Sequence, residues 1–318
     1  MLTVLLGLSG AVVYGAADFL GGLASKRLRA VTVSAVAAAV GIVPLLVGLV
    51  VVGGVVTWTG TLWGAVAGAS GGIGVLLLYR ALAIGPMSVL SPLTAVFAAV
   101  VPVLVAVFRG TALSGLAIAA LVVAVVAVVL VAAVRDTSGA RVTVSGLVTA
   151  AVAGCGFGGI VLAYDMTPSD SGVAPLVVAR VLQAVLLGAA AVVSGRLVRP
   201  GGAGEPAASA DVAGSPAPPG HVVRPAPVRS RGSGRWPKRL LLTVVACGVL
   251  DAMANVFIQA GLHSSDDPVT LPVVSVLNAL YPIGTVVLAG VVLRERLTPV
   301  QWTGIGLAFA ASVGLALA

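Results

Sequence analysis

Ten stretches of about 20 predominantly apolar residues follow one another along this sequence and determine its fold class. Only 9% of the 318 residues are charged, and the mean hydropathy is +1.16. Because the stretches are continuously apolar and do not alternate, helices are favoured over the strands of a membrane barrel. The sequence therefore predicts an all-α integral membrane protein with ten transmembrane helices, approximately at residues 2–22, 30–52, 61–79, 87–108, 112–134, 142–163, 172–193, 240–262, 269–293 and 300–318.

Basic residues between the stretches predict the orientation of the chain. If the helices alternate in direction, Arg109 lies on one side of the membrane, and the other side receives the basic linker together with Lys26, Arg27, Arg29, Arg80, Arg135, Arg141, Arg294 and Arg296. Loops rich in Lys and Arg remain cytoplasmic, so both termini are expected outside the cytoplasm. The net charge of +8 then reflects membrane orientation and contact with lipid, and we expect no nucleic-acid partner.

Residues 195–238 differ from the rest of the chain. They contain eight prolines among glycine, alanine, serine and arginine. Such a segment does not contain enough apolar side chains to form a core, so we expect a disordered basic linker that interrupts the second half of the protein. An arm that responds to lipid or binds a partner is the alternative.

An internal repeat divides the chain into two halves. The fourth and ninth stretches each contain two prolines ten residues apart, in Ser91–Pro102 and in Leu271–Pro282. Tyr14-Gly15 in the first stretch can be laid over Cys155-Gly156 in the sixth. Five helices per half is an odd number, so the second half must insert upside down. We expect two inverted five-helix repeats, at residues 1–138 and 139–318, as in carriers that work by alternating access.

Two segments resemble the EamA-type transporters of the drug/metabolite transporter superfamily. Residues 294–304, with Glu-Arg-Leu-Thr followed by Trp-Thr-Gly, are similar to the end of each half in that family. Residues 81–93 are similar to the family's junction between its third and fourth helices. The first half departs from the pattern at 109–114, which lacks the glutamate, and Tyr14-Gly15 stands where the family often has Trp-Gly.

The resemblance implies a non-ATP secondary transporter in the cytoplasmic membrane that exports a small organic metabolite or drug-like solute. It also implies cytoplasmic termini, whereas the charge pattern predicts the opposite orientation. The sequence leaves the solute, the coupling ion and the oligomeric state open.

Three ionisable side chains fall inside the apolar stretches: Asp18, Arg180 and Asp251. A charge in the middle of a membrane helix costs about 2.5 to 3.5 kcal/mol on insertion scales, which favours placement toward the bundle interior. Arg180 and Asp251 lie at similar depths and can pair. A structural ion pair and a role in binding solute or protons are both open for them, and Asp18 can instead extend toward the membrane surface or pair with Lys26.

Further polar residues share helix faces with these groups. Asn255 and Gln259 follow Asp251 at i+4 and i+8, and Tyr14 precedes Asp18 by four residues. Asn278 and Tyr281 are three residues apart beside Pro282. We expect all five to line the binding cavity; the alternative is a hydrogen-bonded seam between helices.

Other function classes have weaker support. Gly68-Ala69-Ser70-Gly71 is similar to the sequence around some intramembrane serine nucleophiles, but a nucleophilic serine needs a base, and both histidines, His221 and His263, lie outside the apolar stretches. The sequence contains no phosphate-binding loop for ATP. We expect no enzyme, metal or cofactor, while a membrane sensor or structural protein remains an alternative. The two cysteines, Cys155 and Cys247, lie inside separate apolar stretches, and we expect both to be buried thiols.

Overall fold

The computed structural model describes residues 1–25, 27–84, 87–132, 143–197, 237–292 and 298–317. These residues form helices and no strands. The helices are α1 (Leu2–Ser25), α2 (Ala30–Val51), α3 (Trp58–Ile84), α4 (Met87–Phe108), α5 (Gly115–Ala132), α6 (Val144–Asp165), the short 3₁₀ helix η1 (Ser169–Ser171), α7 (Ala174–Leu197), α8 (Lys238–Leu262), α9 (Thr270–Asn278), α10 (Tyr281–Val292) and α11 (Pro299–Leu317).

Six of these helices are long and apolar enough to cross a bilayer: α1, α2, α3, α6, α7 and α8. Shorter apolar helices occupy the predicted fourth, fifth and ninth stretches. Large apolar side chains project outward from the bundle, among them Val50, Phe108 and Phe309, each at least 74% exposed. Lipid is the solvent that suits such a surface, and the chain is a multi-pass membrane protein.

The ninth predicted stretch is not one continuous helix, which corrects the sequence-based expectation. It forms α9 and α10, separated at Ala279 and Leu280. Pro282 permits a break here, because its ring lacks an N–H group and crowds the carbonyl of Asn278, four residues earlier. The corresponding prolines of the fourth stretch leave α4 continuous.

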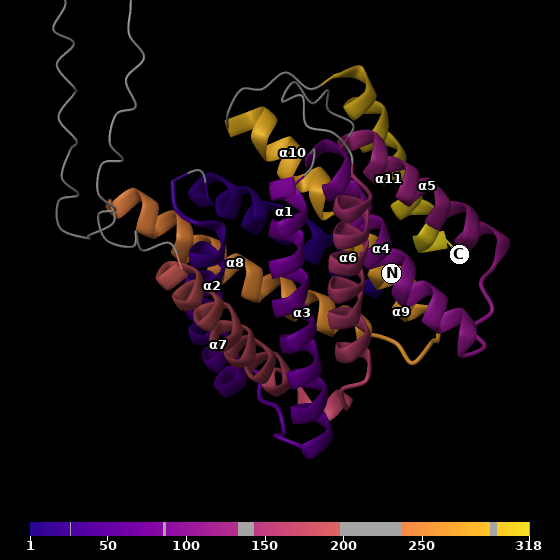
Figure 1. Ribbon diagram of the computed structural model, residues 1–318. Coiled ribbons are helices and arrows are strands. Elements are labelled where there is room, and N and C mark those ends of the chain that lie inside the picture. The colour runs from indigo at the N-terminus through magenta and orange to yellow at the C-terminus, as the bar shows by residue number, and fades with distance from the viewer. Residues whose placement is uncertain (26, 85–86, 133–142, 198–236, 293–297, 318) are drawn as a thin grey trace, which may run out of the picture.

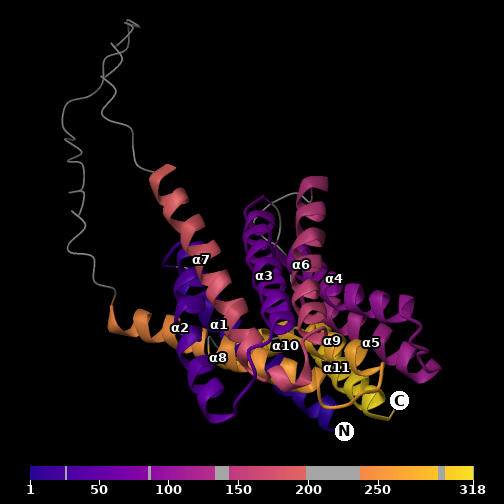
Figure 2. The same cartoon turned by 90° about the horizontal axis from the view of Figure 1, so that it is seen from below.

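Helices that are far apart in sequence form the main contacts. Helix α1 packs on α8, and α3 packs on α6. In the same way, α2 contacts both α7 and α8, α3 contacts α7, and α5 contacts α11. Figures 1 and 2 show α3 beside α6 and α5 beside α11, with the two termini close together. Each half of the chain therefore packs mainly against the other half.

Glycines permit the closest of these approaches. A Cβ atom on Gly248 of α8 would clash with the backbone carbonyl of Ala37 on α2, and one on Gly68 of α3 would clash with the carbonyl of Ala179 on α7. Gly64 and Gly72 continue the same strip along α7. Gly248 follows Gly68 by 180 residues, and Ala179 follows Ala37 by 142. The first separation equals the offset of the proline pairs, and the second differs by one residue from the offset of 141 between the first and sixth stretches.

The connections α2–α3, α4–α5, α6–α7 and α8–α9 lie on the same side of the bundle as the N-terminus, and we call this side the N-terminal face. Thr3 bonds to Ser264 here (2.7 Å), and Thr57 bonds to Ser171 (3.2 Å). The amide of Val55 donates to the carbonyl of Asp170 (3.0 Å). We call the opposite side, where α7 ends and α8 begins, the linker face. The linker between Leu197 and Lys238 lies outside the described residues, apart from its ends.

Candidate functional site

A buried ion pair joins two helices that are expected to cross the middle of the membrane. Arg180 on α7 pairs with Asp251 on α8, as the depths of the two residues in the sequence suggested. The guanidinium of Arg180 also donates to the side-chain oxygen of Gln183, one turn along α7 (2.9 Å). Gly41 of α2 lies beside this arrangement, because a Cβ there would be in van der Waals contact with Nε of Arg180 (3.5 Å).

Helix α1 presents Tyr14 and Asp18 toward the same region. Gly10 and Gly21 face Ile258 and Cys247 of α8, whereas Gly15 faces the backbone of α10. At about 100° of rotation per residue, Tyr14 and Asp18 fall between these two packed faces. The side chains of α1 and α10 also meet directly: the rings of Tyr14 and Tyr281 lie 6.4 Å apart at an angle of 54°.

Electrostatic interactions connect the residues of this region. The charges of Asp251 and Arg180 interact electrostatically with the hydroxyl groups of Tyr14 and Tyr164. Asp18 interacts with Asp251 and with Tyr281. The structure thus brings Tyr14, Asp18, Arg180, Asp251 and Tyr281 together, although they come from four helices.

Access to these side chains decreases toward the N-terminal face. Asp18, near the linker-face end of α1, is exposed. Along α8, the side chain of Asp251 is 25% exposed, whereas Asn255 and Gln259 are only 4% and 6% exposed. The region is therefore more open toward the linker face.

The hydrogen bonding of three predicted site residues, Asn255, Gln259 and Asn278, differs from one to the next. The amide of Asn255 donates to the backbone carbonyl of Asp251 (2.8 Å). Gln259 donates to the hydroxyl of Thr167 (3.3 Å) and to the carbonyl of Gly172 (2.9 Å), which binds α8 to the α6–α7 connection. The side-chain oxygens of Asn278 and Gln259 are buried without a hydrogen-bond partner. The break after Asn278 interrupts the helix face that Asn278 and Tyr281 were expected to share.

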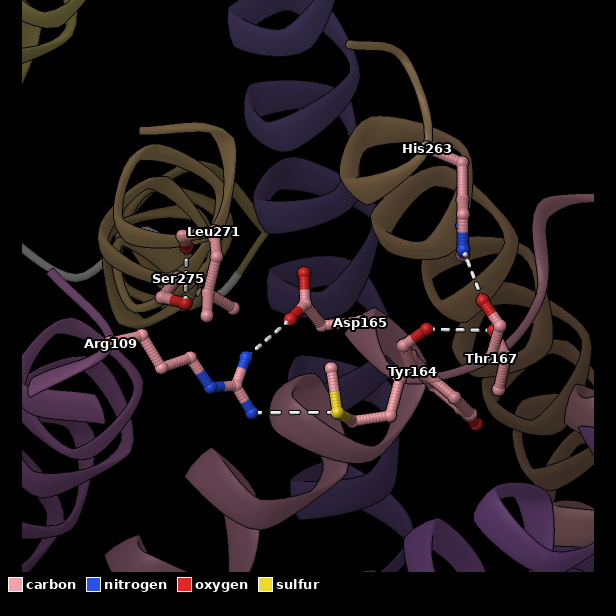
Figure 3. Close-up of polar contacts among 8 residues, drawn as sticks. Arg109, Tyr164, Asp165, Thr167, His263, Leu271 and Ser275 are labelled. Atoms are coloured by element: carbon pink, nitrogen blue, oxygen red, sulfur yellow. Dashed lines mark hydrogen bonds and ion pairs between the residues drawn. The ribbon is translucent and has the colours of Figure 1, made fainter. Parts of the chain in front are cut away.

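Figure 3 shows a second polar group, at the N-terminal face, which the sequence did not reveal. The ring of His263 reaches the carbonyl of Thr167, and Arg109 bonds to Asp165 (3.1 Å). His263 was set aside because it lies beyond the eighth apolar stretch. Gln183 was also missed, although its position three residues after Arg180 on an apolar helix was a usable signal.

Ser70 and the cysteines bear on the alternative enzyme hypothesis. The hydroxyl of Ser70 donates to the backbone carbonyl of Gly156 (2.8 Å), so it joins α3 to α6. Cys247 is buried as expected, but Cys155 is exposed, which corrects the expectation that both thiols are buried. The apolar stretch predicted buried surroundings for Cys155, but its side chain points to the outside of the bundle.

Comparisons with known proteins agree with the sequence resemblance. Residues 217–317 match the EamA-like transporter family, which belongs to the drug/metabolite transporter superfamily. None of the curated proteins matches the chain. A solved crystal structure with 14% sequence identity superposes with a TM-score of 0.70, covering 99% of this chain and 96% of the other, so the two proteins share a fold.

Proposed function

We propose that this chain, a member of the EamA-like transporter family through residues 217–317, is a secondary transporter that exports a small organic solute by alternating access. The observation that carries the proposal is the ion pair of Arg180 and Asp251 beside the accessible Asp18. A soluble protein can place such groups at its surface cheaply, but each costs several kcal/mol in lipid. A water-filled solute pathway between helices is a setting in which that cost is reduced.

The two halves, residues 1–138 and 139–318, are proposed as inverted repeats. The exchange of neighbours supports this, because α1 packs on α8 as α6 packs on α3. The glycine contacts support it as well, since Gly68 with Ala179 and Gly248 with Ala37 are equivalent under the offsets of 180 and 142 residues. Two halves of this kind can rock against each other about a site between them.

The ion pair of Arg180 and Asp251 has no counterpart in the repeat. Under the same offsets, Arg180 corresponds to Ala38, and Asp251 corresponds to Gly71. The scaffold is thus repeated, while the polar chemistry is not. We assign solute or proton binding to Asp18 and Asp251, positioning of Asp251 to Arg180, and aromatic contact with the solute to Tyr14 and Tyr281.

The remaining predicted residues take roles along the same path. Asn255 and Asn278 lie deeper and are proposed to meet the solute through their amides; the unpaired oxygen of Asn278 supports this role. Gln259 holds the N-terminal face closed in this conformation. The greater exposure of Asp18 supports solute entry from the linker face. The positive charges of the loops predict that this face lies on the cytoplasmic side of the cell membrane.

Asp18→Asn should reduce export at least about tenfold, because a charge-assisted hydrogen bond contributes about 1.5–3 kcal/mol and the amide cannot bind a proton as the carboxylate does. Metabolite profiling of cells with and without the protein identifies the solute. The ratio of that solute outside and inside the cells then measures export by the variant.

Asp266→Asn, in the exposed α8–α9 connection, is the matched control and should export normally. Both variants should reach the membrane in normal amounts. Full export by Asp18→Asn would remove this carboxylate from the mechanism. If profiles of cells with and without the protein were identical, the transporter proposal itself would fail.

A further inference from the structure

The α6–α7 connection is bonded to the end of α8 through two side chains. Gln259 donates to Thr167 and Gly172, and His263 lies one turn further on, at the C-terminal end of α8. The hydroxyl and carbonyl of Thr167 therefore each receive a bond from α8. We call Thr167, Gly172, Gln259 and His263 the latch.

Both ring nitrogens of His263 face backbone carbonyl oxygens. Nδ1 lies 3.0 Å from the carbonyl oxygen of Gln259, and Nε2 lies 2.9 Å from that of Thr167. A carbonyl oxygen only accepts hydrogen bonds, so each nitrogen must carry a hydrogen to form both. A neutral imidazole has one N–H group, whereas the imidazolium has two. The geometry is that of protonated His263.

Negative charge lies on several sides of the ring. His263 lies at the C-terminal end of α8, where the unpaired carbonyl groups carry partial negative charge. The carboxylate of Asp165 on α6 interacts with His263 and is itself paired with Arg109. Among the residues that the structure describes, the other charged groups at this face are Asp170 of η1, Asp266 and Asp267 of the α8–α9 connection, and the amino group of Met1.

Deprotonation would weaken the latch in either neutral form of the ring. With the remaining hydrogen on Nε2, the bond to Thr167 would lose its positive charge, and the lone pair of Nδ1 would point at the carbonyl oxygen of Gln259; with it on Nδ1, the bond to Thr167 would be lost. The second case would free the α6–α7 connection from His263. The connection would then be held to α8 by Gln259 alone among the latch side chains.

We propose that His263 is a proton-operated latch: the imidazolium holds the N-terminal face closed, and release of its proton to water at this face allows the α6–α7 connection to separate from α8. In the transporter proposed above, on which this role depends, the separation opens the side of the pathway opposite Asp18. The latch chemistry itself requires no solute. Because only the imidazolium can donate from both nitrogens, acid should favour closure, and a rise in pH should favour opening.

Spin labels at Ser169 and Ala260 can test the latch. Both positions are exposed, one in the α6–α7 connection and the other on α8. The native thiols would first be replaced by serine at Cys155 and Cys247. The distance distribution, measured in nanodiscs at pH 5.5 and pH 8.5, should show a separated population that rises about tenfold at the higher pH, in line with the loss of a hydrogen bond to a charged group.

His263→Gln should abolish the pH response, because an amide keeps the same hydrogens at both pH values. His221→Gln in the linker should retain it. An unchanged response in His263→Gln, or none in the parent protein, would overturn the latch.

A second measurement is possible because the sequence contains two histidines. In His221→Gln labelled with ¹⁵N-histidine, the signals come from His263 alone, and their shifts distinguish imidazolium from each neutral tautomer. The separated population should increase in step with loss of the imidazolium signals. If the ring lost its proton with no change in the distance between the spin labels, protonation would not operate the latch. This outcome can be read from His221→Gln, which keeps His263, even if His263→Gln does not fold. Since both measurements need no solute, their failure is separate from failure of transport.

Discussion

Arg180→Ala should lower the free energy of unfolding by about 1–3 kcal/mol, less than the loss of about 3–5 kcal/mol that is usual when one partner of a fully buried ion pair is removed. The substitution leaves Asp251 without the guanidinium that now neutralises it. The side chain of Asp251 is 25% exposed, so water can compensate for part of the loss. Unfolding in mixed micelles, with the free energy extrapolated to native conditions, measures the loss.

The double variant Arg180→Ala/Asp251→Ala distinguishes the free energy of the ion pair from that of the packing of the two side chains. It should be more stable than the sum of the single losses predicts, because the second substitution removes the orphaned charge. Transport should be lost in both variants. A cost below about 1 kcal/mol for Arg180→Ala would indicate a solvated pair of the kind found at protein surfaces.

Gly68→Ala and Gly248→Ala should each cost about 1–3 kcal/mol, because a new methyl group must displace the backbone of the neighbouring helix. The contacts of these glycines with Ala179 and Ala37 are equivalent in the proposed repeat. The two losses should therefore be similar. Thermal and denaturant unfolding of the purified variants provide the comparison.

Gly188→Ala on α7 and Gly306→Ala on α11 are the matched controls, since an added Cβ at either position meets no atom within 4 Å. Replacing an unpacked helical glycine by alanine should be neutral or stabilise the protein by up to about 1 kcal/mol. A large loss at Gly68 with none at Gly248, or the reverse, would contradict equivalent packing in the two halves.

The helical segments were well predicted because lipid imposes a simple requirement on the chain. An apolar stretch with no water around it must satisfy its backbone internally, and a helix does this within one segment. The division of the ninth stretch was harder to predict. Two proline pairs with equal spacing leave α4 continuous but separate α9 from α10. Proline spacing indicates where a helix can break, whereas packing decides whether it does.

The geometry of the candidate site was predicted in part. The pairing of Arg180 with Asp251 was predicted because charged residues are rare in apolar stretches and because depth along a helix can be counted from sequence. The bonds of Gln259 could not be found in this way, because they end on Thr167 and Gly172 in a connection without periodicity. His263 was missed for a related reason: its partners are backbone carbonyls, which every residue possesses and no sequence pattern marks.

The central claim is that the polar groups around Asp251 form a solute pathway. Its most direct test is flux, in proteoliposomes without ATP, of the solute that metabolite profiling identifies. The account predicts flux driven by a gradient through the parent protein and a decrease of at least about tenfold in Asp251→Asn, with equal insertion of both proteins. Equal flux through protein-free liposomes, the parent protein and Asp251→Asn would contradict it.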